Sequence, residues 1–242
     1  MNKKFAITFI VTFIVFFLFN GYFDFSSYEL DKVYLTVSTF LFSVFNGFFI
    51  SRQSSRYSEI RNSLSRFDAD MSIIFRESTH LNQDEHSYIR EVIATHYKTL
   101  LLKKDWAYYF THKSNLVSSL HEYIGICGAK DMDKVRGEAI RVIMKTLDDI
   151  QMVRKTLVSL KEETIPKLQQ IFIYVLAAIL FMAILTLPSQ GLVLASVLKS
   201  IYMLTVVIVV VLLKKFDNLT IFEGTIGEHS AKDMLGIIEG EK

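Results

Sequence analysis

Polar residues recur along one face of the apolar segment Val33 to Ile50. They are Thr36, Thr39, Ser43 and Asn46, and their spacing of three or four residues would align them on an α-helix. In lipid these side chains would lack partners, so the stripe must face either another helix or a water-filled path. Ser43 and Gly47 are small residues four apart, a spacing that lets membrane helices approach closely, so helix packing is the simpler interpretation.

The adjacent face of the same segment is apolar. Phe40, Val44 and Phe48 follow one another at steps of four. If several copies surrounded an axis, these side chains would form stacked apolar rings, and such constrictions gate channels by dewetting. A stripe that faces lipid or a helical core has the same spacing, so the residues alone leave both interpretations open.

Asp68 and Asp70 lie beyond this segment, in a polar region. A symmetric assembly would repeat either carboxylate as an acidic ring that attracts cations. Arg61 and Arg66 are near enough in sequence to form surface ion pairs with them instead, and such pairs contribute little to stability.

Residues for other chemistry are not arranged in useful patterns. The six histidines show no short zinc-ligand spacing, and one cysteine cannot build a Cys-rich metal site within a chain. Phosphate-binding, dinucleotide-binding and nucleophile-elbow motifs do not occur. We therefore expect no enzyme activity, no metal and no cofactor, and a net charge of +2 gives no indication of nucleic-acid binding.

The candidate residues must be positioned by membrane helices. With 51% hydrophobic residues and 20 Phe among 242, the chain is too apolar for an ordinary soluble domain. About 20 apolar residues span a bilayer as a helix. The sequence predicts an all-α membrane protein with four transmembrane helices in two hairpins: Phe5 to Phe23, Val33 to Ile50, Ile171 to Leu187 and Leu192 to Leu213.

Lysine and arginine residues near the span ends predict the orientation. These residues stay on the cytoplasmic side, and they flank the first hairpin at Lys3 and Arg52 and the second at Lys167 and Lys214. Both termini are therefore expected in the cytoplasm. Lys199 falls within the fourth span, where we expect its side chain to snorkel to the outer interface.

The region between the hairpins has helical periodicity. Its apolar residues recur at steps of three and four, and no Pro or Gly lies between Phe48 and His80, so the second span should continue as a cytoplasmic helix. We assign residues 1–50 and 166–215 to the hairpins and 51–165 to a cytoplasmic helical domain. Residues 216–242 form a tail, and its four glycines predict an irregular segment.

A set of short segments shares one further pattern: Asn46-Gly47-Phe48-Phe49, Ser51-Arg52, Arg56-Tyr57, Arg61, Phe67-Asp68-Ala69-Asp70, Tyr97 to Trp106, Val153-Arg154-Lys155 and Lys214-Lys215-Phe216-Asp217. Together these segments resemble the bacterial bestrophin-like family of membrane proteins. The likeness covers most of the chain, although Asp68 stands where a Glu is expected.

This resemblance implies a location in the bacterial inner membrane and a relationship to bestrophins, which are homopentameric ion channels. Their second membrane helix lines an apolar neck, which would correspond to Phe40, Val44 and Phe48 here. The leading hypothesis is a homo-oligomeric channel for small inorganic ions, with five subunits implied by the resemblance and four as the alternative. The competing hypothesis is a non-conducting membrane-anchored scaffold or signalling protein that acts through its cytoplasmic helices.

Overall fold

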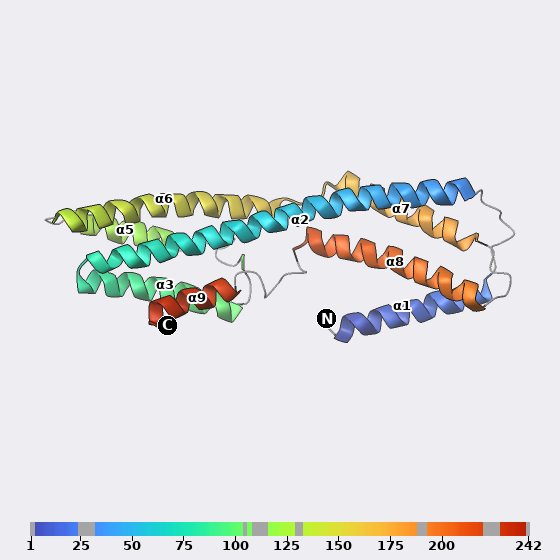
Figure 1. The fold of residues 1–242 in the computed structure, drawn as a ribbon, viewed down its shortest axis with the longest axis horizontal. Helices are drawn as coiled ribbons and strands as arrows, with labels where there is room; N and C mark the ends of the chain where they lie inside the picture. The colour runs from blue at the N-terminus through green and yellow to red at the C-terminus, as the bar shows by residue number, and fades with distance from the viewer. Residues whose placement is uncertain are drawn as a thin grey trace. The chain divides into compact units, whose positions relative to one another are not determined.

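The computed structural model describes residues 3–23, 32–103, 106–107, 116–128, 133–187, 193–219 and 228–240. Every regular element within these ranges is helical, as the sequence predicted (Figure 1). In chain order the elements are α1 (Lys3–Tyr22), α2 (Lys32–Glu77), the short 3-10 helix η1 (Ser78–His80), α3 (Gln83–Lys103), α5 (Leu116–Gly128), α6 (Lys134–Glu162), α7 (Lys167–Leu185), α8 (Val193–Asp217) and α9 (Glu228–Glu239).

The chain forms two compact units. The first contains Met1–Ser54 and Thr164–Asn218, and the second contains Ser55–Glu163 and Leu219–Lys242. Helix α2 is unbroken over 46 residues and contributes to both units, as the absence of Pro and Gly after Phe48 predicted. Each unit therefore combines segments that are far apart in the sequence.

The first unit contains the apolar helices. Helix α8 packs against both α1 and α7, and in Figure 1 it lies between them. The core of the first unit includes Phe42 from α2, Leu176 and Leu180 from α7, and Met203 and Val206 from α8. The helices bury these residues on one side and leave many other apolar side chains exposed, as expected for helices surrounded by lipid.

Among the described residues, three helical stretches are long and apolar enough to cross a membrane. They lie in α2, in the α6–α7 stretch and in α8, and their length and composition suit an integral membrane protein. The predicted first span corresponds to α1, whose described apolar part, Ile10–Tyr22, is shorter. The predicted outer loops fall largely on residues 24–31 and 188–192, outside the described residues.

The second unit has a continuous core between α2, α3, α5 and α6. Its fully buried side chains include Ile60, Ile89, Leu120, Ile143 and Leu157, which come from all four helices. On each helix the buried residues recur at steps of three and four, so one face is apolar. Burying one such side chain stabilises the fold by about 1.5–3 kcal/mol, which makes this packing the main source of stability.

The ends of α6 are defined by side-chain hydrogen bonds. The Asp133 carboxylate accepts a hydrogen bond from the Lys134 backbone N–H at the helix start. At the other end the buried Arg56 guanidinium donates to the backbone carbonyls of Leu160, at 2.6 Å, and Lys161, at 2.9 Å. These last carbonyls have no partner within the helix, so Arg56 supplies the missing donors.

The C-terminal tail contains a helix that the sequence did not predict. Helix α9 has 12 residues, packs against α3 and buries Ala231, Met234 and Ile238 in the core of the second unit. Gly236 lies inside this helix, although we expected the tail glycines to exclude one. The contacts with α3 outweigh the cost of about 1 kcal/mol that a glycine imposes on a helix interior.

Candidate pore-lining helix

The three residues of the predicted neck lie on an exposed face of α2. Phe40 is 65% exposed, Val44 is 50% exposed and Phe48 is 59% exposed. Large apolar side chains are this accessible because none of the described residues covers them. Their common face is therefore available to lipid or to another copy of the protein.

A packed face lies on the other side of α2. Ser38, Phe42 and Phe49 are each less than 10% exposed, and Phe42 and Phe49 belong to apolar clusters that include residues of α7 and α8. At 3.6 residues per turn, their mean direction is roughly 140° from that of Phe40, Val44 and Phe48. The contacts within one chain thus hold α2 with the predicted neck residues pointing away from that chain's own core.

The polar stripe lies between these two faces. Thr36, Thr39 and Ser43 are exposed, whereas Asn46 is buried and donates from Nδ2 to the Phe42 carbonyl at 2.7 Å. A Cβ atom added at Gly47 would meet no atom within 4 Å, so none of the described helices of this chain approaches closely at that glycine. Instead, Thr39, Ser43, Asn46 and Gly47 line a cavity together with residues of α7 and α8.

Asp68, one of the two candidate ion-attracting residues, is bound within the second unit. Its Oδ1 accepts a hydrogen bond from the Tyr97 hydroxyl at 2.7 Å, and its Oδ2 accepts one from the Ser230 hydroxyl on α9. Burial raises the pKa of the Asp68 carboxyl, while the two hydrogen bonds favour the charged form and oppose this rise. Asp68 thus connects α2 to α3 and α9; a role in attracting ions stays a prediction.

Asp70, the second candidate, lies in a different environment. Burial raises the pKa of its carboxyl, the nearby Arg66 lowers it and Asp149 on α6 raises it further. Asp70 Oδ2 accepts no hydrogen bond from the described residues. Within the described ranges, no three His, Cys, Asp or Glu side chains are grouped so that they could hold a metal ion.

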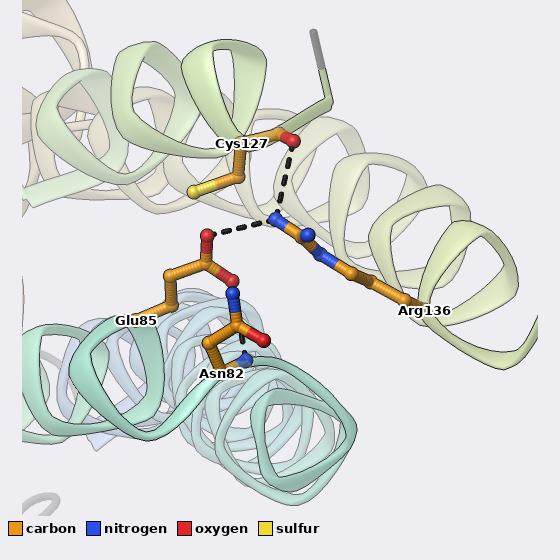
Figure 2. A network of polar contacts seen from close by, with 4 residues as sticks. All are labelled: Asn82, Glu85, Cys127 and Arg136. Carbon is orange, nitrogen blue, oxygen red and sulfur yellow. Dashed lines mark hydrogen bonds and ion pairs between the residues drawn. The ribbon is translucent and has the colours of Figure 1, made fainter. Parts of the chain in front are cut away.

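A buried polar network joins three helices of the second unit (Figure 2). The Arg136 guanidinium on α6 lies 2.8 Å from Glu85 Oε1 on α3 and 3.4 Å from the Cys127 carbonyl on α5. Glu85 Oε2 also accepts a hydrogen bond from the Asn82 backbone N–H at 3.2 Å, just before α3 begins. Sequence reasoning missed this network, although Asn82 and Glu85 have the spacing of a helix capping box.

Asp217, in the first unit, is a second buried carboxylate whose role sequence reasoning missed. Asp217 Oδ1 accepts from the Ile165 backbone N–H at 2.7 Å and from Gln53 Nε2 at 3.4 Å, and Oδ2 accepts from Gln170 Nε2 at 3.1 Å. Asp217 is 6% exposed. It therefore joins α2, the segment before α7 and α8 in one set of hydrogen bonds, which no local sequence pattern indicates.

Lys199 on α8 is buried, and its Nζ donates to the Leu185 carbonyl at 3.4 Å. Snorkelling of this lysine to the outer interface stays a prediction. Leu185 is the last residue of α7, where the helix dipole favours a positive charge. Nearby, Asn20 on α1 donates to the Ser200 hydroxyl at 3.1 Å, which adds a polar contact between α1 and α8.

The comparisons with known proteins give one positive result. The family model described as Bestrophin-like domain matches residues 4–224, which include all but the first residue of α1, the helices from α2 to α8 and the residues of the predicted neck. No curated protein matches the chain, and no solved structure does. The match extends over most of the 242 residues and confirms the resemblance found in the sequence. The chain belongs to the bestrophin-like family.

Proposed function

We propose that this protein is a homo-oligomeric ion channel in which α2 of each subunit surrounds the pore. Phe40, Val44 and Phe48 form its apolar neck. The subunits number five by analogy with bestrophins, with four as the alternative, and the channel lies in the bacterial inner membrane with both termini in the cytoplasm. Membership of the bestrophin-like family supports the proposal at the level of the family.

One observation carries the proposal for this chain. The neck residues are exposed on α2, while the opposite side of the same helix is packed against α7 and α8. A pore-lining helix needs this arrangement. One of its faces must pack against its own subunit, and the face that points to the pore axis must stay uncovered. The apolar rings would exclude water when narrow and admit hydrated ions when α2 moves outward.

Ion flux through reconstituted protein tests the proposal. Vesicles loaded with a fluorescent ion indicator should show flux of small inorganic ions, and Val44→Ala and Phe48→Ala should increase it because smaller side chains make the neck easier to wet. Val175→Ala is the matched control, since Val175 on α7 is 48% exposed and lies outside the predicted neck. Protein that stays impermeable, with no response to either neck substitution, would refute the channel.

A competing proposal is a membrane-anchored scaffold whose second unit binds a partner. Exposed apolar side chains on this unit favour it: Ile126 is 59% exposed, Val135 is 57% exposed and Met152 is 66% exposed. Such residues suit a protein interface. Symmetry decides between the two functions, because a channel requires the neck face of α2 around a common axis and a scaffold does not.

A further inference from the structure

The carboxylate of Asp217, the last residue of α8, joins α2 to the other helices of the first unit. Its Oδ1 accepts a hydrogen bond from the Ile165 backbone N–H at 2.7 Å, and its Oδ2 accepts one from Gln170 Nε2 at 3.1 Å. Gln53 Nε2 on α2 donates to Oδ1 at 3.4 Å. The donors lie 47 to 164 positions from Asp217 in the sequence, so only the folded chain brings them together.

The contact between α2 and α8 is shielded from solvent. Gln53 is 3% exposed and Asp217 is 6% exposed. Phe49 and Leu213 lie one helical turn before them on the same faces of α2 and α8, and both belong to one buried apolar cluster. In such surroundings a hydrogen bond is stronger than in water, and breaking it leaves a buried polar group at a cost.

The three hydrogen bonds differ in length. Those from Ile165 and Gln170 lie within the usual range of about 2.7–3.2 Å, and Gln170 Nε2 also donates to the Ile165 carbonyl at 2.9 Å. These bonds fix the carboxylate relative to the start of α7. The bond from Gln53 is the longest and therefore the weakest. Outward movement of α2 would break this bond first, while Asp217 stays held by the other two.

Gln53 also lies close to the predicted neck along α2. It follows Phe48 by five residues, which corresponds to roughly 7.5 Å along the helix axis and about 140° around it. Phe48 is exposed, whereas Gln53 is buried on the packed side of the helix. A contact that holds Gln53 from this side therefore limits how far the neck face can move.

We infer that Asp217 is a positioning residue that holds α2 in its resting place, and that Gln53 leaves the carboxylate when the neck opens. Asp217 acts on the neck through α2 and needs no contact with a permeating ion. Its effect on flux rests on the proposed channel. The position of α2, in contrast, can be measured whether or not the protein conducts.

The distance between two spin labels tests the position of α2. Ser51 on α2 and Leu194 on α8 are exposed, so both can be replaced by Cys and labelled in a Cys127→Ala background, which removes the only native thiol. Labelled full-length protein is diluted with unlabelled protein in vesicles. The pulsed electron paramagnetic resonance signal then reports the distance within one subunit.

Two leucine substitutions distinguish positioning from general stability. Gln53→Leu should broaden the distance distribution, because it removes the hydrogen bond from α2 and keeps a side chain of similar size. Gln170→Leu is the matched control. It removes the donor to Asp217 and to the Ile165 carbonyl, so it should lower the thermal stability of the membrane helices and leave the distance unchanged. A wild-type distribution for Gln53→Leu, or the same change in both variants, would overturn the inference.

Ion flux separates failure of this inference from failure of the channel. Gln53→Leu should raise basal flux about tenfold, the population shift expected from losing one hydrogen bond to a charged group, whereas Gln170→Leu should not raise it. Unchanged flux for Gln53→Leu, in vesicles where Val44→Ala does raise it, would contradict control of the neck by Asp217. If the wild type and Val44→Ala are both impermeable, the channel is refuted and the spin-label distances alone decide the positioning role.

Discussion

Replacing Arg136 with Met should destabilise the second unit strongly, because it leaves the Glu85 carboxylate buried without its ion partner. The Glu85 side chain is 4% exposed and that of Arg136 is 13% exposed, and their charged atoms lie 2.8 Å apart. Removing one partner of such a buried pair costs about 3–5 kcal/mol. With a typical urea dependence of about 2 kcal/mol per molar, the unfolding midpoint should fall by on the order of 2 M.

The chain contains a suitable reporter for this measurement. Trp106 is its single tryptophan, is 5% exposed and belongs to the core of the second unit. Its fluorescence during urea unfolding of the full-length protein in detergent therefore follows that unit rather than the membrane helices. Far-UV circular dichroism of the same samples would show whether the membrane helices unfold separately.

Two further variants make the result interpretable. Arg141→Met removes an ion pair with Glu138 whose side chains are 77% and 57% exposed, so it should leave the midpoint unchanged. Glu85→Gln combined with Arg136→Met removes the buried charge and should recover most of the loss. The reasoning is wrong if Arg136→Met behaves like Arg141→Met, or if the double variant is as unstable as the single one.

Two other substitutions test the same core with the same fluorescence assay. Leu157→Ala removes a fully buried side chain of α6 and should cost about 2–5 kcal/mol, whereas a loss below that of an exposed substitution such as Met152→Ala would contradict its burial. Burial lowers the pKa of His96 to about 3, against about 6.5 in an unfolded chain. The folded protein therefore keeps this ring neutral, and its contribution to stability should be lost as pH falls from about 6.5 towards 3, with a slope of up to about 1.4 kcal/mol per pH unit. His96→Leu should reduce that slope, and identical pH profiles for the two proteins would count against a neutral buried ring.

Local patterns in the sequence predicted much of the fold. Hydrophobic runs and steps of three and four depend on neighbouring residues alone, and they indicated α2, α3, α6, α7 and α8. The continuity of α2 followed from the lack of Pro and Gly after Phe48. The same patterns could not predict α9, because its stability depends on contacts with α3, far away in the sequence.

The candidate site shows the same limit. The spacing of Phe40, Val44 and Phe48 placed them on one face, but only the fold shows that this face is uncovered. The partners of Asp68, Asp217 and Lys199 come from other helices, so their roles could not be read from nearby residues. For Lys199 the contact with the last carbonyl of α7 could not be predicted, because that carbonyl belongs to another helix.

The contact between Ser230 and Asp68 has a consequence for the order of events during synthesis. The two residues are 162 positions apart, and α7 and α8 lie between them in the sequence. During synthesis α2 and α3 are made early. The Asp68 carboxylate can accept its hydrogen bond from the Ser230 hydroxyl only after α7, α8 and then α9 have left the ribosome. Completion of the second unit therefore waits for the synthesis of α7 and α8, so a chain truncated before α9 would leave a partly buried carboxylate and the apolar surface of α3 exposed to quality-control proteases.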